Sequence, residues 1–154
     1  MNAPTIGTRV PRKEDHRFLT GAGQYTDDIS MPNQAYAVFV RSPHAHAQIA
    51  SVNTERAKRA PGVVGVFTGE DLAAAKVGGL PCGWLITGVD GQPMKEPAHP
   101  CLAQGKVRHV GDPVAAVIAE SLAAARDAAE LVDVSYQVLP AVADVGSARA
   151  PGAP

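Results

Sequence analysis

Residues 107–119 read VRHVGDPVAAVIA, and this stretch organises the core of a chain of 154 residues. Gly111 and Asp112 favour a turn, and apolar residues lie on both sides of it. Pro113 can begin the strand over 113–119, because the N–H that proline lacks is not needed at that position. The stretch therefore predicts two strands joined by a tight turn. A turn aimed at a neighbouring domain is the alternative interpretation.

The residues that follow predict a strand–helix–strand unit. Ser121 is placed to cap a helix over 122–131, where frequent alanine would allow close packing on a sheet. Residues 132–138 alternate apolar and polar side chains and predict the last strand. We expect the strands 113–119 and 132–138 to pair in parallel through a right-handed crossover.

Upstream of this unit, short strands alternate with short helices. Residues 34–40 are apolar on both faces and predict a strand that is buried on both sides. Thr54, and the pair Thr68 and Asp71, stand where helix caps are found. The other expected elements are strands over 47–52, 63–67 and 106–109 and helices over 55–59 and 70–75. The order favours an α+β fold, with short helices packed on a mixed sheet.

Two further segments lack this regular pattern. Residues 77–105 are rich in glycine and proline and predict a long irregular loop, of the kind that carries function or packs against a partner. Trp84 lies in this loop beside Leu85 and Ile86, and such an apolar cluster needs a surface to pack on. Residues 1–25 predict an extended N-terminal arm.

The N-terminal arm is expected to contain one helical turn that ends at Gly21. Phe18 and Leu19 are the expected apolar anchors of this turn. Arg12, Arg17 and their basic neighbours are nearly balanced by carboxylates. We interpret the arm as a salt-bridged segment that docks on the domain or on a neighbour.

The composition is that of one ordinary globular domain, with 45% hydrophobic residues, 19% charged residues and a net charge of −1. Aromatic residues make up only 5%, so the core must be built mostly from Val, Ala, Leu and Ile. The sequence shows no basic stripe of the kind that binds nucleic acid, no apolar run long enough to span a bilayer and no secretory signal. We expect a cytoplasmic protein in which Cys82 and Cys101 are free thiols. The alternative is a disulfide between them in an oxidising compartment.

Groups that could carry chemistry are few. His44 and His46 lie on one side of an extended segment and could share a metal with Cys101, but their spacing matches no metal signature. Hydrogen bonds at a strand end are the favoured interpretation of both histidines. No nucleophile elbow and no dinucleotide fingerprint occurs. The sequence therefore predicts no catalytic, cofactor-binding or metal-ligating residue in this chain.

Six segments, in order, resemble the opening domain of the molybdenum hydroxylase large subunit, of the xanthine dehydrogenase, aldehyde oxidase and aerobic carbon monoxide dehydrogenase family. They are 12–25, 41–49, 61–68, 100–103, 107–119 and 136–142. The resemblance implies an α/β hammerhead fold. In that family a molybdenum ion on a pterin cofactor takes two electrons as a carbon centre is hydroxylated, with water as the oxygen source. The pterin-binding motifs and the glutamate base lie downstream of this domain, so the resemblance implies a structural and assembly role.

The resemblance also implies the organisation and partners of the chain. It divides the chain into the arm over 1–25, a hammerhead domain over 26–140 and a linker over 141–154 towards a molybdenum-binding domain that the chain lacks. The implied partners are the molybdenum-binding domains of the same bacterial large subunit, and iron–sulfur and flavin subunits. The expected interface residues are Arg12, Arg17, Phe18, Arg41, His44, Trp84, Gly111, Asp112 and Pro113.

Three hypotheses therefore stay open. The first is a hammerhead domain of an oxidoreductase large subunit, inactive by itself. The second is a free-standing interaction module that assembles with a separately encoded cofactor-binding chain. The long loop that contains Trp84 is the reason for this hypothesis. The third is a small metal-dependent enzyme that uses His44, His46 and Cys101.

Overall fold

The computed structural model describes Gly7 and residues 10–154. The beginning of the expected N-terminal arm, residues 1–6 and 8–9, lies outside the described residues. The chain divides into two compact units, residues 1–34 and 35–154, and each is described by itself.

The first unit contains helix α1 (Asp15–Leu19) and the 3-10 helix η1 (Thr26–Asp28). The N–H of Ala22 donates to the carbonyl of Arg17 at 2.9 Å, and the N–H of Gly21 donates to Phe18 at 3.2 Å. These two bonds end α1 in a Schellman motif, as predicted for Gly21. Within this unit Leu19 is 86% exposed and Phe18 is 40% exposed, so the unit itself does not bury them, and their role as apolar anchors stays a prediction.

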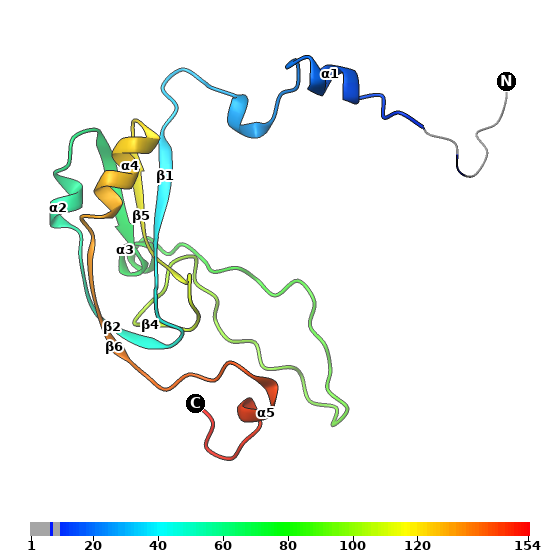
Figure 1. The fold of residues 1–154 in the computed structure, drawn as a ribbon. Helices are drawn as coiled ribbons and strands as arrows, with labels where there is room; N and C mark the ends of the chain where they lie inside the picture. Colours follow the sequence, from blue (N-terminus) through cyan, green and yellow to red (C-terminus); the bar gives the residue numbers. More distant parts are fainter. Residues whose placement is uncertain (1–6, 8–9) are drawn as a thin grey trace. The chain divides into compact units, whose positions relative to one another are not determined.

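The second unit contains two three-stranded sheets with short helices (Figure 1). The first sheet has the order β1-β5-β3, and its strands are β1 (Tyr36–Arg41), β5 (Pro113–Ala119) and β3 (Val63–Thr68). The second has the order β4-β2-β6, with β4 (Lys106–Val107), β2 (Ala47–Asn53) and β6 (Asp133–Val138). The helices are α2 (Glu55–Lys58), α3 (Gly69–Ala74), α4 (Leu122–Ala129) and α5 (Val145–Ala148). The predicted α+β class is confirmed, but both sheets are antiparallel and no single mixed sheet forms.

The expected parallel pair of the last two long strands is wrong. β5 is the central strand of the first sheet, and it is hydrogen-bonded to β1 on one edge and to β3 on the other. No edge of β5 is therefore free to pair with β6. Instead, β6 pairs antiparallel with β2, and Val134 lies opposite Val52. The chain between β5 and β6 therefore crosses from one sheet to the other.

Two small clusters of valine and alanine form the core, as the composition predicted. Val117 on β5 packs with Ala57, Val66 and Ala128 beneath α2 and α4. Val114 belongs to a second cluster, with Ala47, Ala103 and Val107. Alternate residues of a strand point to opposite faces, so the three-residue step from Val114 to Val117 lets one strand join both clusters.

The helix caps agree with the sequence in two cases out of three. The N–H of Thr68 donates to Asp71 Oδ2 at 2.7 Å and the N–H of Asp71 donates to Thr68 Oγ1 at 3.3 Å, which is the predicted capping box. Ser121 Oγ accepts the N–H of Ala124 at 3.1 Å and caps α4. Thr54 has a helical backbone conformation and makes no side-chain cap. The amide oxygen of Asn53 accepts the N–H of Glu55, the first residue of α2, at 3.1 Å.

One face of the first sheet is open, which corrects the prediction that the strand over 34–40 is buried on both sides. In the register of the sheet, Phe39 lies opposite Ala116 and Ala116 lies opposite Phe67. Both phenylalanines are 46% exposed, because α2 and α4 cover the other face. We call Ala37, Phe39, Phe67, Ala116 and Ile118 the open face.

Residues 77–105 form the predicted long excursion without a regular helix or sheet. Its two limbs run side by side and are joined at three levels: Leu80 N–H to His99 O at 2.8 Å, Met94 N–H to Ile86 O at 3.0 Å and Gly88 N–H to Gln92 O at 2.8 Å. Figure 1 shows these limbs in green as a long double-stranded projection. We call residues 79–99 the hairpin arm.

Candidate functional site

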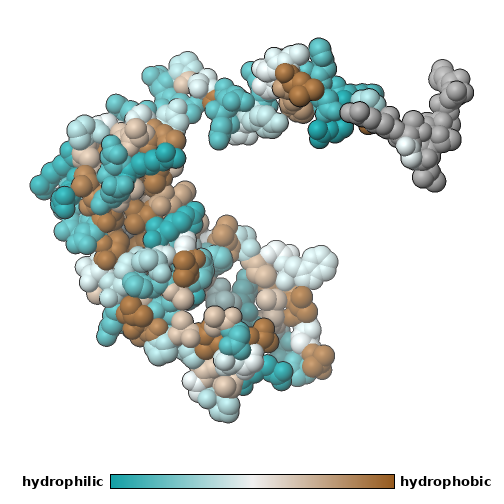
Figure 2. Space-filling model, in the orientation of Figure 1, coloured by the Kyte–Doolittle hydropathy of each residue, from teal (hydrophilic) through white to brown (hydrophobic). Residues whose placement is uncertain are grey.

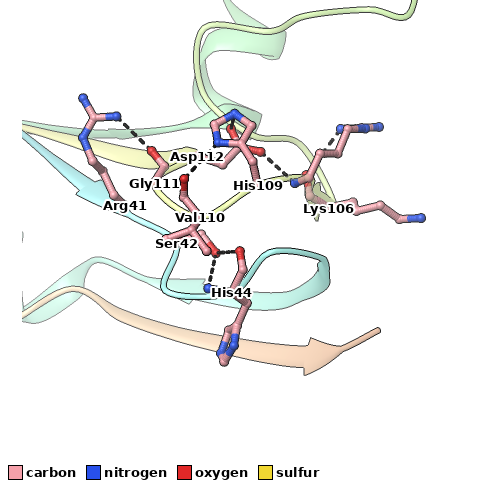
Figure 3. Close-up of polar contacts among 9 residues, drawn as sticks. Arg41, Ser42, His44, Lys106, His109, Val110, Gly111 and Asp112 are labelled. Atoms are coloured by element: carbon pink, nitrogen blue, oxygen red, sulfur yellow. Dashed lines mark hydrogen bonds and ion pairs between the residues drawn. The ribbon is translucent and has the colours of Figure 1, made fainter. Parts of the chain in front are cut away.

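A tight turn between β4 and β5 brings several expected interface residues together. Gly111 has a φ of +87°, a conformation that glycine adopts without steric cost. Its N–H donates to the carbonyl of Ser42 at 2.8 Å, and the N–H of Ser42 donates to the carbonyl of Asp112 at 2.9 Å. The guanidinium of Arg41 donates to the Gly111 carbonyl at 2.9 Å, as Figure 3 shows. The turn is thereby fixed to the end of β1, where Pro113 lies opposite Arg41.

The carboxylate of Asp112 is used within this turn. Its Oδ2 accepts the backbone N–H of Arg108 at 2.9 Å, and its Oδ1 lies 3.8 Å from Nε2 of His109. The Asp112 side chain is only 15% exposed, whereas that of His109 is 60% exposed. Asp112 therefore holds the turn in shape, and His109 is the member that solvent or a partner can reach.

The two histidines of the 44–46 segment make local contacts at the edge of the second sheet. Ser42 Oγ donates to the His44 carbonyl at 2.9 Å and accepts the His44 N–H at 3.0 Å. The His44 ring meets the Tyr136 ring edge-on, with the centroids 5.0 Å apart. Burial raises the pKa of the Tyr136 hydroxyl, so this group stays neutral at physiological pH. Nδ1 of His46 lies 2.6 Å from the carbonyl of Pro140, which ties the segment to the chain after β6.

The structure does not assemble the metal site considered for His44, His46 and Cys101. Within residues 10–154 and Gly7, no three His, Cys, Asp or Glu side chains gather in a way that could hold a metal ion. Cys101 is exposed, and its thiol donates to the Gly78 carbonyl at 3.4 Å. Cys82 is also exposed and unpaired.

The hairpin arm carries large apolar side chains that its own limbs do not cover. Trp84 is 79% exposed, Leu85 65% and Ile86 59%. Figure 2 shows apolar atoms at the surface of this projection. Trp84 was the predicted interface residue of the loop, and the structure places it on a limb where a partner can reach it.

Arg108 borders two hollows of about 520 Å³ each. One lies at the base of the hairpin arm and includes Leu80 and His99. The other is lined by His46, Lys106, Arg108 and His109, with apolar residues of the chain after β6, and we call it the basic groove. Sequence reasoning missed this groove, because His46 and Lys106 approach only through the pairing of β2 with β4.

The nine expected interface residues thus fall into three groups. Arg41, His44, Gly111, Asp112 and Pro113 come together at the turn between β4 and β5. Trp84 lies on the hairpin arm. Arg12, Arg17 and Phe18 belong to the first unit, where Arg12 pairs with Asp15 at 2.8 Å and the Arg17 guanidinium lies 5.1 Å from the Phe18 ring centre.

Comparison with known proteins gives one family. The family model described as "Aldehyde oxidase and xanthine dehydrogenase, a/b hammerhead domain" matches residues 20–140. The nicotine 6-hydroxylase large subunit of Paenarthrobacter nicotinovorans is 45% identical over 139 residues, which are 90% of this chain and 16% of the relative. The carbon monoxide dehydrogenase large chain of Afipia carboxidovorans is 38% identical over 149 residues, covering 97% of this chain and 17% of the relative. The xanthine dehydrogenase molybdenum-binding subunit of Escherichia coli is 36% identical over 124 residues, covering 80% of this chain and 16% of the relative.

A solved structure has the same fold. The reconstituted CO dehydrogenase from Oligotropha carboxidovorans aligns with a TM-score of 0.79 at 38% identity, covering 96% of this chain and 17% of that chain. The chain therefore spans about a sixth of the length of the relatives that it matches. None of the helices in the described residues is long and apolar enough to cross a membrane.

Proposed function

Because this chain belongs to the α/β hammerhead domain family of aldehyde oxidase and xanthine dehydrogenase, we propose that it is the N-terminal structural and assembly domain of a molybdenum hydroxylase large subunit. In this role the domain supplies a docking surface and no catalytic residue. The enzyme it serves is an oxidoreductase of the xanthine dehydrogenase, aldehyde oxidase and carbon monoxide dehydrogenase type. The relatives named above, which include a molybdenum-binding subunit, support the assignment.

The observation that carries the proposal is the amount of large apolar side chain that the second unit leaves exposed. Trp84, Leu85 and Ile86 extend from the hairpin arm, and Phe39 and Phe67 stand on the open face. Exposed apolar surface that gathers in this way marks a surface that is covered in an assembly. The remainder of the large subunit is the natural cover, because the relatives are about six times as long as this chain.

The cofactor belongs, in this proposal, to the remainder of the large subunit. Among the described residues, no group of three or more His, Cys, Asp or Glu side chains could hold a metal ion. When bound in the complete enzyme, the molybdenum cofactor would supply the two-electron oxidation. Iron–sulfur and flavin subunits are the proposed acceptors of those electrons, and the cytoplasm is the proposed location.

We also propose the division of the chain made from its sequence, with an arm over 1–25, the hammerhead domain over 26–140 and a linker over 141–154. The end of the family match at residue 140 supports the start of the linker. The contact residues of the proposed interface are Arg12, Arg17, Phe18, Arg41, His44, Trp84, Gly111, Asp112 and Pro113.

Capture of the molybdenum-binding remainder by this chain tests the proposal. The tagged chain would be mixed with the purified remainder of the large subunit, and the captured protein and molybdenum would be measured. We expect the wild-type chain to retain both, and Trp84→Ala combined with Ile86→Ala to retain much less. Val64→Ala is the matched control, because Val64 is an apolar residue of β3 that is 66% exposed and lies away from the hairpin arm.

No capture of the remainder by the wild-type chain would refute the assembly role. If the hairpin-arm variant captures the remainder as well as the wild-type chain does, the assembly role stands but the hairpin arm is not part of the interface. A free-standing chain that docks on a separately encoded partner would pass the same capture test. The size of the polypeptide in the cell distinguishes that alternative.

A further inference from the structure

The basic groove gathers positive charge on a chain whose net charge is −1. Lys106 and Arg108 are two residues apart on an extended segment and therefore project to the same side. His46 comes from the start of β2, next to Ala47, which pairs with Val107. His109 completes the set, and no aspartate or glutamate lines the hollow of about 520 Å³.

The two permanent cations of the groove have no carboxylate partner within the described residues. In the second unit the ion pairs join Arg59 to Glu55 and His109 to Asp112, and neither includes Lys106 or Arg108. The Arg108 guanidinium makes one long contact, 3.5 Å to the Lys106 carbonyl. In Figure 3 the Lys106 side chain extends away from the turn, and no contact is drawn to its ammonium group.

The walls of the groove indicate what could occupy it. Val110, Val142 and Pro154 are among the apolar residues that line it between the cations. A free phosphate prefers a cradle of backbone N–H groups, which an apolar wall does not provide. A peptide segment with carboxylates among apolar side chains fits both features, since arginine binds carboxylates through two parallel hydrogen bonds.

We propose that the basic groove is a docking site for a carboxylate-bearing segment of the molybdenum-binding part of the large subunit. The inference rests on the proposed assembly function and assigns to that function a second, electrostatic contact besides the apolar hairpin arm. Charge complementarity is the reason for the choice of partner. The five-sixths of the relatives' length that this chain does not match is the place where the acidic segment would lie.

The test is the affinity of this chain for the purified remainder of the large subunit, measured by calorimetry at about 50 mM and about 300 mM salt. Lys106→Gln combined with Arg108→Gln should raise Kd about tenfold at the lower salt, the effect expected of two partly exposed charge pairs. The same variant should lose most of the salt dependence. Arg56→Gln is the matched control, because it removes one cation from α2 and Arg56 does not line the groove.

The outcomes separate this inference from the proposed function. An unchanged Kd and an unchanged salt dependence in the groove variant, with Trp84→Ala still weakening binding, would overturn the groove and leave the assembly role intact. Absence of binding by the wild-type chain would overturn both. Direct binding of inorganic phosphate to the wild-type groove in calorimetry, with an unchanged Kd for the remainder in the groove variant, would assign the groove to a free anion and overturn the docking proposal. Circular dichroism would establish that each variant is folded. Arg108→Lys, which keeps the charge but loses the two parallel hydrogen bonds, should bind more weakly than the wild type and more tightly than Arg108→Gln.

Discussion

Alanine at Gly69 tests how α3 is joined to the core. Gly69 is buried at the start of α3 and has an ordinary backbone conformation. A Cβ added there would lie 3.0 Å from Leu102 O and 3.0 Å from Ala103 C, and closer still to Ala103 O. These are backbone atoms of a segment in which Leu102 is 2% exposed and the Ala103 N–H donates to Pro113 O at 2.7 Å. The segment cannot move away without disturbing both the core and the start of β5.

Overpacking of this kind costs about 1–3 kcal/mol, and the rigid neighbour places Gly69→Ala near about 3 kcal/mol. Gly111→Ala is a useful contrast, because an added Cβ meets nothing within 4 Å there and only the φ of +87° is unfavourable. That conformational cost is about 1 kcal/mol. Gly83→Ala has neither a contact within 4 Å nor a positive φ, and should be neutral.

Urea unfolding followed by circular dichroism would give the three free energies of unfolding. For a domain of this size each kcal/mol lowers Tm by roughly 3–4 °C, so Gly69→Ala should melt about 10 °C below the wild type. Gly111→Ala should melt roughly 3–4 °C lower. A Gly69→Ala protein as stable as Gly83→Ala would refute the close packing of α3 on the 102–103 segment.

Three further predictions follow from single contacts. Leu102→Ala empties one of the largest buried side-chain sites and should lower the free energy of unfolding by about 2–5 kcal/mol, measured by urea titration. The side-chain and backbone hydrogen bonds to Thr68 lower the pKa of Asp71, so its stabilisation should be present above about pH 4, the range of a free carboxyl. It should be lost as the pH falls through the lowered folded-state pKa, and Asp71→Asn should flatten that part of the curve of stability against pH. Trp84→Ala should leave Tm within about 2 °C of the wild type, because the indole is 79% exposed, while it weakens capture of the partner; a large fall in Tm would show that the indole packs on its own domain.

The local signals in the sequence predicted most of the elements. The cap at Ser121, the pair Thr68 and Asp71, and the bond from the Arg108 N–H to Asp112 inside the turn each depend on neighbours within a few residues. Such contacts form in almost any tertiary context, so the sequence alone reveals them. The valine- and alanine-rich core followed in the same way from the scarcity of aromatic residues.

The choice of strand partners could not be predicted in this way. A right-handed parallel crossover is the common solution for a strand, a helix and a strand, but here both edges of β5 are taken by β1 and β3. The strands that occupy those edges come from residues about 50 and 80 positions upstream, and no local sequence pattern predicts that they pair with β5. The open face is a consequence of the same arrangement, since the helices cover only one side of β5.

Two smaller misses have local causes. Asn53 takes the capping role expected of its neighbour Thr54: Asn53 Oδ1 accepts the Glu55 N–H at 3.1 Å, whereas Thr54 has a helical backbone conformation and makes no side-chain cap. Helix α5 was missed in a segment that was interpreted as a linker from its Ala, Pro and Gly content. Asp144 Oδ1 accepts the N–H of Ser147 at 2.8 Å, so a capping signal was present in the sequence.

The central claim is that this domain acts as part of a molybdenum-containing enzyme. The most direct measurement is precipitation from the source cell with an antibody raised against this chain, followed by determination of the molybdenum content and of the size of the recognised polypeptide. We predict that molybdenum precipitates with the domain and that the recognised band lies far above 15.9 kDa. A band at that mass with molybdenum in a second chain would mean a separately encoded partner, and a precipitate without molybdenum would contradict the account.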